Sequence, residues 1–211
     1  MPRSYKIKEC FYTLQGEGAQ SGRAAVFLRF TGCNLWSGRE EDRHAAVCQF
    51  CDTDFIGTDG TNGGRYTLRE CVELVQRLWP GGGNPYVVCT GGEPLLQLDL
   101  PLISALQAAG FEVAVETNGT LPVPKEIDWV CVSPKANAEL VVTQGDELKL
   151  VYPQREAQAQ PDRFADMKFQ HFFLQPKDER GTNHTAATVA YCLSHPRWKV
   201  SLQTHKIMGI E

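Results

Sequence analysis

The sequence predicts an α/β protein whose largely parallel sheet curves into a partial, open TIM-like barrel. Strand-like apolar runs alternate with helix-like runs along the 211 residues, and glycine-rich or polar motifs directly follow the strands. Ligands bind beyond the carboxyl ends of the strands in such sheets, so these motifs should meet on one rim. About six or seven strands are expected, fewer than a closed eight-unit barrel of roughly 250 residues requires.

Local signals justify the expected elements in order. Thr67 and Glu70 have the spacing of a capping box and open a helix that ends before Pro80, and Gly110 closes a second helix. The expected helices span residues 67–79, 99–109 and 185–194. Strands are expected at the apolar runs 25–30, 86–90, 111–116, 127–132, 147–151, 168–174 and 199–203. We expect these elements to form a single domain over residues 1–211.

Composition and charge exclude several classes of protein. Hydrophobic residues make up 42% and charged residues 22% of the chain, as in an ordinary globular protein. The formal net charge of −4 argues against a strongly basic nucleic-acid-binding surface. No apolar run approaches the roughly 20 residues of a membrane helix. The first residues have no apolar signal core, so we expect a cytoplasmic protein with no nucleic-acid or membrane partner.

The eight cysteines divide into two groups. A reducing cytoplasm argues against a disulfide framework, so clustered cysteines indicate metal or redox chemistry. Five cysteines stand singly in or beside apolar runs, where a free thiol commonly packs as a small hydrophobic side chain. These five are Cys10, Cys71, Cys89, Cys131 and Cys192.

Cys33, Cys48 and Cys51 form the second group. Cys33 follows the first predicted strand, fourteen residues separate it from Cys48, and two separate Cys48 from Cys51. Zinc would need a fourth ligand, which His44 could supply. A 4Fe–4S cluster on three thiolates would instead keep one iron open for a small molecule. Spacing alone leaves both interpretations open, and either one places the metal site in a loop of residues about 31–65.

Several blocks resemble a known family. Cys48-Gln49-Phe50-Cys51 and Gly91-Gly92-Glu93-Pro94 resemble the cysteine and glycine-rich motifs of the radical S-adenosylmethionine superfamily, although the first cysteine interval is lengthened here to fourteen residues. From about Cys10 to the C-terminus, the chain resembles the 7-carboxy-7-deazaguanine synthases of queuosine biosynthesis. The blocks that carry this resemblance are residues 11–18, 51–53, 116–119, 133–135, 174–176 and 201–206.

The resemblance implies a set of cofactors and their ligands. A 4Fe–4S cluster would be held by Cys33, Cys48 and Cys51, and Mg²⁺ by Thr53, with water and substrate oxygens completing its coordination. The open iron would chelate S-adenosylmethionine, whose reductive cleavage yields a 5′-deoxyadenosyl radical. The residues expected to bind S-adenosylmethionine are Phe50, Gly92, Glu116, Asn118, Ser133, Pro134, Lys135 and Gln175.

The resemblance also implies a lyase reaction. The substrate would be 6-carboxy-5,6,7,8-tetrahydropterin, converted by ring contraction and loss of ammonia to 7-carboxy-7-deazaguanine. Arg29 has the planar donors to bind the substrate carboxylate. The residues expected to bind the substrate are Leu14, Gln15, Gly16, Arg29, Thr90, His205 and Glu211. The family further implies a homodimer and an electron donor such as a flavodoxin or ferredoxin.

Two alternatives remain beside this interpretation. An activase of the same superfamily, which installs a glycyl radical on a partner protein, would leave Arg29 and residues 14–16 without a role. A zinc-stabilised binding module would use His44 as its fourth ligand. Arg29 taken alone could also pair with a structural carboxylate, because such ion pairs are common.

Overall fold

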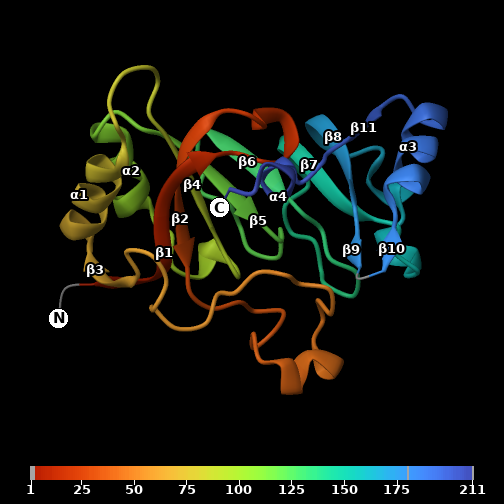
Figure 1. Cartoon of the computed structure of the whole chain (residues 1–211), viewed down its shortest axis with the longest axis horizontal. Coiled ribbons are helices and arrows are strands. Elements are labelled where there is room, and N and C mark those ends of the chain that lie inside the picture. The colour runs from red at the N-terminus through yellow and green to blue at the C-terminus, as the bar shows by residue number, and fades with distance from the viewer. Residues whose placement is uncertain (1–2, 180, 211) are drawn as a thin grey trace.

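A nine-stranded sheet forms the centre of the protein (Figure 1). The computed structural model describes residues 3–179 and 181–210. The strands lie in the order β11-β8-β7-β6-β5-β4-β2-β1-β3. Their bounds are β1 Ser4–Leu14, β2 Ala24–Phe30, β3 Gly64–Thr67, β4 Tyr86–Gly91, β5 Glu112–Thr117, β6 Trp129–Val132, β7 Gln144–Tyr152, β8 Lys168–Pro176 and β11 Trp198–Val200.

Every strand pair from β2 to β11 is parallel, whereas β1 pairs antiparallel with both β2 and β3. In the described part of the chain, the edge strands β3 and β11 pair with no further strand, so the sheet does not close. The predicted α/β class with an open, largely parallel barrel is therefore confirmed.

Helices pack at both ends of the sheet. Figure 1 shows α1 and α2 together at one end and α3 at the other. None of the helices in the described ranges is long and apolar enough to cross a membrane. The helices are α1 Leu68–Leu78, α2 Leu100–Ala108, α3 Thr185–Ser194 and α4 Thr204–Met208. The short elements are the 3₁₀ helices η1 Gly18–Gln20, η2 Glu40–Ala45, η3 Pro94–Leu96, η4 Ala157–Ala159 and η5 Pro161–Phe164, and the strands β9 Asp178–Glu179 and β10 Thr182–Asn183.

The local signals place most elements within a few residues of their observed bounds. The capping box at α1 forms as predicted, because Thr67 N donates to Glu70 Oε2 at 2.8 Å and Thr67 Oγ1 accepts from Glu70 N. Two elements that line the site were not predicted, namely β1 and α4. In β1 a bulge between Ile7 and Glu9 interrupts the two-residue alternation that identifies a strand.

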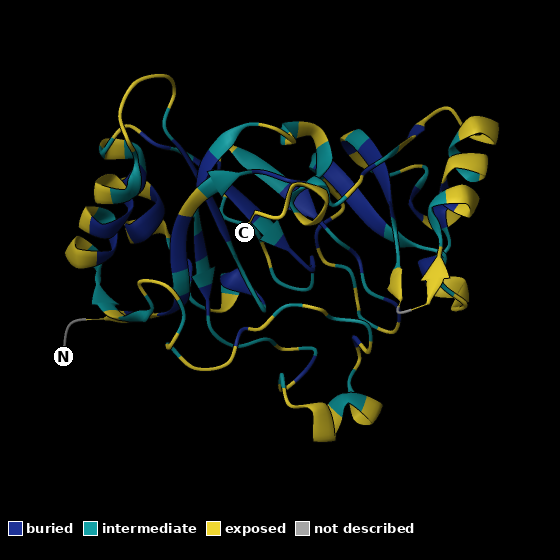
Figure 2. Ribbon diagram, in the orientation of Figure 1, coloured by how far each residue is buried: buried dark blue, intermediate teal, exposed yellow. Residues whose placement is uncertain are grey.

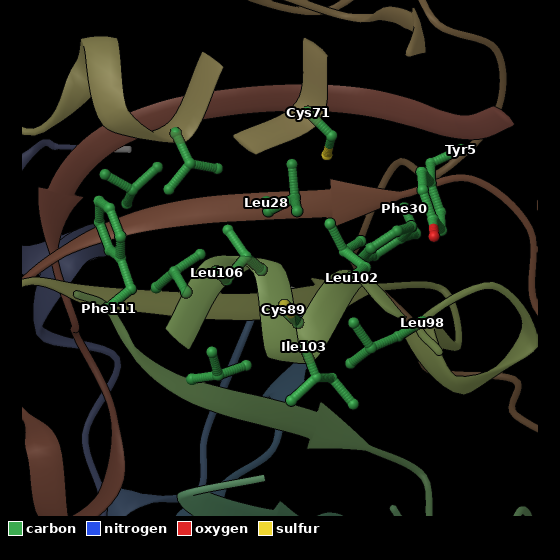
Figure 3. Close-up of a cluster of buried hydrophobic side chains, with 14 of the residues drawn as sticks. Tyr5, Leu28, Phe30, Cys71, Cys89, Leu98, Leu102, Ile103, Leu106 and Phe111 are labelled. Carbon is green, nitrogen blue, oxygen red and sulfur yellow. The ribbon is translucent and has the colours of Figure 1, made fainter. Parts of the chain in front are cut away.

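Two buried clusters pack on the outer face of the sheet. Figure 3 shows Leu102 and Leu106 of α2 and Cys71 of α1 against Leu28 and Cys89 of the sheet. Cys10 belongs to the same cluster, and Cys192 of α3 packs against the second one. The interpretation of these four cysteines as packing residues is confirmed.

The inner face of the sheet differs from the outer face because side chains alternate along each strand. In β7, Leu148 and Leu150 are fully buried in the outer core, whereas Glu147 and Lys149 point the other way, into the barrel. A third buried cluster, formed by Ala25, Tyr86, Val88 and Ala114, fills part of the barrel interior. The carboxyl end of the barrel is polar and is where a cavity opens.

Leu106 provides a test of the outer core. It is completely buried beneath α1, whereas Leu193 of α3 is 79% exposed. We expect Leu106→Ala to lower the free energy of unfolding by about 2–5 kcal/mol, because it removes apolar contacts and leaves a cavity. The matched variant Leu193→Ala should change it by less than about 0.5 kcal/mol. Chemical denaturation measures both, and equal effects would contradict the assigned core.

Candidate functional site

A cavity of about 410 Å³ lies at the carboxyl ends of the parallel strands. It collects most of the side chains that sequence reasoning selected. Those that line it are Leu14, Gln15, Gly16, Arg29, Cys48, Phe50, Cys51, Thr53, Thr90, Gly92, Glu116, Asn118, Ser133, Lys135, Gln175 and His205. Cys33 and Pro134 lie outside the lining, and Glu211 lies outside the described residues.

Cys48 and Cys51 form a turn at the cavity wall. The Cys48 thiol donates a hydrogen bond to Cys51, which lowers the pKa of Cys51 to about 6 despite its partial burial. The same hydrogen bond, together with burial, raises the pKa of Cys48. The Cys33 sulfur accepts a hydrogen bond from the Leu35 amide at 3.4 Å. Backbone donors of this kind suit metal-bound thiolates.

The long interval between Cys33 and Cys48 folds back to support the cysteine turn. Figure 1 shows the segment that carries η2 projecting below the sheet, and Figure 2 shows η2 as largely exposed. Arg43 of η2 lies with its guanidinium 4.1 Å from the ring centroid of Trp36. Its Nη1 donates to the carbonyls of Gln49 at 2.9 Å and Cys51 at 3.0 Å. The loop therefore braces the Cys48–Cys51 backbone from the solvent side.

Gly92 brings the ends of β2 and β4 into close contact. A methyl group at this position would overlap the carbonyl oxygen of Gly32 and lie 2.7 Å from Cβ of Cys33. The Glu93 amide next to it donates to the same Gly32 carbonyl at 2.9 Å. The glycine is thus required for close packing beside Cys33.

Glu93 joins two of the predicted blocks. Its carboxylate is fully buried and accepts hydrogen bonds from the Thr117 hydroxyl at 2.9 Å and the Asn118 amide at 2.8 Å. Burial raises the pKa of Glu93, and these donors partly counteract that rise. The Asn118 side chain in turn donates to Asn34 Oδ1 at 3.0 Å, next to Cys33. The ends of β4 and β5 and the cysteine loop are therefore one connected unit.

The arrangement of donors favours a cluster over a single zinc ion. In residues 3–179 and 181–210, no three His, Cys, Asp or Glu side chains are placed to hold one ion. His44, the candidate fourth zinc ligand, is exposed and does not line the cavity. In a 4Fe–4S cluster each thiolate binds its own iron, so the three sulfurs need not converge on one point. The donor set fits a three-cysteine cluster beside the cavity.

Charged side chains form the floor of the cavity. Lys149 Nζ donates to Glu17 Oε2 at 2.6 Å and to Glu116 Oε2 at 2.7 Å. Burial alone would raise the pKa of Glu17, but the charge and hydrogen bond of Lys149 and the donor of Gln203 lower it to about 2. Burial alone would lower the pKa of Lys149, and its acidic neighbours raise it well above its usual value. Both groups are therefore ionised at neutral pH.

Three side-chain amides orient these carboxylates. Gln15 donates to Glu116 Oε1 at 3.0 Å. Gln175 and Gln203 donate to Glu17 Oε1 at 3.1 and 3.0 Å. The amides come from the residue after β1, from β8 and from the segment before α4, so the floor depends on three segments far apart in the sequence.

The segment around α4 closes one side of the cavity. The Thr204 amide donates to the Gly16 carbonyl at 2.9 Å, and Gly16 has no room for a side chain because His205 lies against it. Lys206 Nζ lies 2.7 Å from Asp52 and 2.6 Å from Asp178. These contacts tie the tail of the chain to the cysteine turn and to β9.

Arg29 lines the cavity but already has a partner. Its Nε donates to Glu9 Oε1 at 2.7 Å, so the ion pair considered in the sequence analysis is present. Thr90 lies beside Arg29 in the register of β2 and β4. Lys135, expected to bind S-adenosylmethionine, donates to Ser133 Oγ at 2.6 Å.

Sequence reasoning missed several residues of the site. Glu17, Gln203 and Lys206 lie in family-like blocks but were not selected individually. Lys149 could have been found from the alternation of charged and apolar residues over 147–151. Cys131 is buried as expected for a packing residue, but it also donates to Glu116 Oε2 at 3.7 Å.

Comparisons with known proteins agree with this geometry. A family model described as the Radical SAM superfamily matches residues 43–133. A protein of Caulobacter vibrioides named 7-carboxy-7-deazaguanine synthase is 59% identical over 211 residues, covering 98% of this chain and 99% of the relative. A protein of the same name from Bordetella pertussis is 58% identical over 212 residues, with 98% and 99% covered.

A solved structure is also similar. The crystal structure of QueE from Escherichia coli superimposes with a TM-score of 0.71 at 27% sequence identity, covering 94% of this chain and 93% of that one. The relatives match across nearly the whole length, including every block that lines the cavity. The chain belongs to the 7-carboxy-7-deazaguanine synthase family of radical S-adenosylmethionine enzymes.

Proposed function

We propose that this cavity converts 6-carboxy-5,6,7,8-tetrahydropterin to 7-carboxy-7-deazaguanine, with loss of ammonia, in queuosine biosynthesis. The observation that carries the proposal is a single cavity that joins the cysteine turn, the ends of the parallel strands and Arg29. A 4Fe–4S cluster and S-adenosylmethionine, when bound, supply the radical chemistry of the family, and Mg²⁺ is its third cofactor. The protein's own residues bind and orient the cofactors and the substrate and enclose them in the cavity.

The roles of individual residues divide between the two walls of the site. We assign the cluster to Cys33, Cys48 and Cys51, and Mg²⁺ to Thr53, which lines the cavity. Arg29 supplies a planar donor for the substrate carboxylate, as a guanidinium does for carboxylates in general. The remaining expected contacts to S-adenosylmethionine are Phe50, Gly92, Glu116, Asn118, Ser133, Pro134, Lys135 and Gln175. Those to the substrate are Leu14, Gln15, Gly16, Thr90, His205 and Glu211.

The proposal includes properties of the whole protein. We expect a single domain over residues 1–211, because one continuous sheet runs through the described ranges. A homodimer, a flavodoxin or ferredoxin as electron donor and a cytoplasmic location complete the proposal. The reported relatives are named as synthases rather than as glycyl-radical activases or zinc modules, so neither alternative gains support.

Turnover is the direct test of the proposed reaction. Anaerobic incubation of the reconstituted protein with the tetrahydropterin, S-adenosylmethionine, Mg²⁺ and a reductant should yield 7-carboxy-7-deazaguanine, without stoichiometric loss of S-adenosylmethionine. Chromatography with mass detection measures both compounds. Cys33→Ala should lose the cluster and the product together, because it removes one of three thiolates. Zinc in place of iron and sulfide in the wild-type protein would refute the proposal.

Gly92 tests how the fold places Cys33. We expect Gly92→Ala to lower the iron bound per chain, because the added methyl group would displace the Gly32-Cys33 backbone. Gly110→Ala is the control, since Gly110 has a positive φ of 90° and open space around its Cβ position. It should cost stability and leave the iron content unchanged. Equal iron in both variants would show that the Gly92 contact does not position Cys33.

Arg29 tests the substrate carboxylate site. We expect Arg29→Ala to raise the KM for the pterin roughly 10- to 100-fold, the loss of hydrogen bonds to a charged group, with iron content unchanged. Arg155→Ala, at an exposed arginine outside the cavity lining, is the control and should leave KM unchanged. An unchanged KM in Arg29→Ala would mean that Arg29 serves only its ion pair with Glu9.

A further inference from the structure

Lys149 is a charged side chain in a place where charge is costly. The residue is 3% exposed and lies on the inner face of β7, at the floor of the cavity. Removing an ammonium group from water costs several kcal/mol, and nearby carboxylates offset that cost only with good geometry. Apolar residues of similar volume often replace buried ion pairs without loss of stability. Stability therefore does not account for a lysine at this position.

The floor has more negative than positive charge. Lys149 contacts two carboxylates, Glu17 and Glu116, at 2.6 and 2.7 Å. Glu147 lies near the same lysine, and burial raises its pKa. One ammonium between two carboxylates leaves a net negative floor. Such a floor complements a ligand edge that is rich in N–H donors.

The two carboxylates keep room for further donors. A carboxylate has about four lone-pair positions. Among the described residues, Lys149, Gln175 and Gln203 donate to Glu17. Lys149, Gln15 and Cys131 donate to Glu116. These donors hold the carboxylates in place and leave about one lone-pair position on each for a ligand.

Arg29 and the carboxylates around Lys149 lie on separate strands of the cavity lining. Arg29 lies on β2, and Lys149 lies on β7, four places away in the strand order. The proposed substrate has a matching arrangement, since its carboxylate lies on the reduced ring and its 2-amino and N3–H groups lie on the pyrimidine ring. With the carboxylate at Arg29, the N–H-rich edge would face the floor.

We propose that Lys149 is a positioning residue, which holds Glu17 and Glu116 as paired acceptors for the N–H-rich pyrimidine edge of the substrate, so that Glu116 serves the substrate rather than S-adenosylmethionine. This inference rests on the proposed function, because it takes the pterin as the ligand. It assigns selection for the 2-amino group to a lysine that need not touch the substrate. Without the ammonium, the two carboxylates would repel each other, and each would bind a proton more readily.

Binding of 6-carboxypterin tests the proposal without requiring turnover. Ligand fluorescence would give its Kd with reconstituted wild-type protein and with Lys149→Met, which keeps an unbranched side chain. We expect Kd to rise roughly 10- to 100-fold in Lys149→Met, with iron content unchanged. Lys199→Met, at an exposed lysine of β11, is the matched control and should bind as the wild type does.

An analogue separates positioning from a general loss of structure. The same ring system without the 2-amino group should bind the wild-type protein more weakly than 6-carboxypterin, and Lys149→Met should reduce this preference. Glu17→Gln, which keeps the side-chain shape, should have the same effect and serves if Lys149→Met does not fold. Unchanged Kd and unchanged preference in either folded variant would overturn the inference. Binding by a wild-type protein that forms no product would refute the proposed function alone.

Discussion

Parallel pairing of the strands from β2 to β8 is the constraint on which the site depends. It brings the carboxyl ends of all these strands to one rim, so that residues separated by more than a hundred positions line one cavity. Close contacts at this rim then join the strand ends to the cysteine loop. Gly92 lets β4 approach Cys33, and the Glu93 carboxylate accepts a hydrogen bond from Asn118 after β5. The sheet therefore determines where the cysteine loop lies.

The outer face of the sheet forms the apolar core, and the inner face carries the charged residues of the site. Apolar side chains of the outer face pack under α1, α2 and α3. The Cys71 thiol stays protonated there, because burial raises the pKa of Cys71 to about 12. The inner face carries Glu116 and Lys149, which meet Glu17 of the turn after β1 at the floor of the cavity. Buried charge of this kind adds little stability on average, so its presence points to ligand recognition.

Segments outside the regular strands enclose the cavity and join its parts. The loop between Cys33 and Cys48 uses Arg43 to brace the cysteine turn, which gives its unusual length a structural role. The tail, α4, packs against Gly16 and reaches Asp52 and Asp178 through Lys206. The cysteine loop, the turn at Gly16 and α4 are therefore linked by direct contacts. A displacement of one of them would displace the others.

The sequence by itself determined the α/β class, most strands and helices and the blocks of the site, because these follow from local periodicity, capping residues and short motifs. Only the tertiary structure decided which carboxylates pair with Lys149, that Arg29 already binds Glu9, and that the tail closes the cavity. The bulge in β1 and the short helix α4 also escaped local signals. Such pairings depend on distances between segments remote in the chain, and local patterns contain no information about those distances.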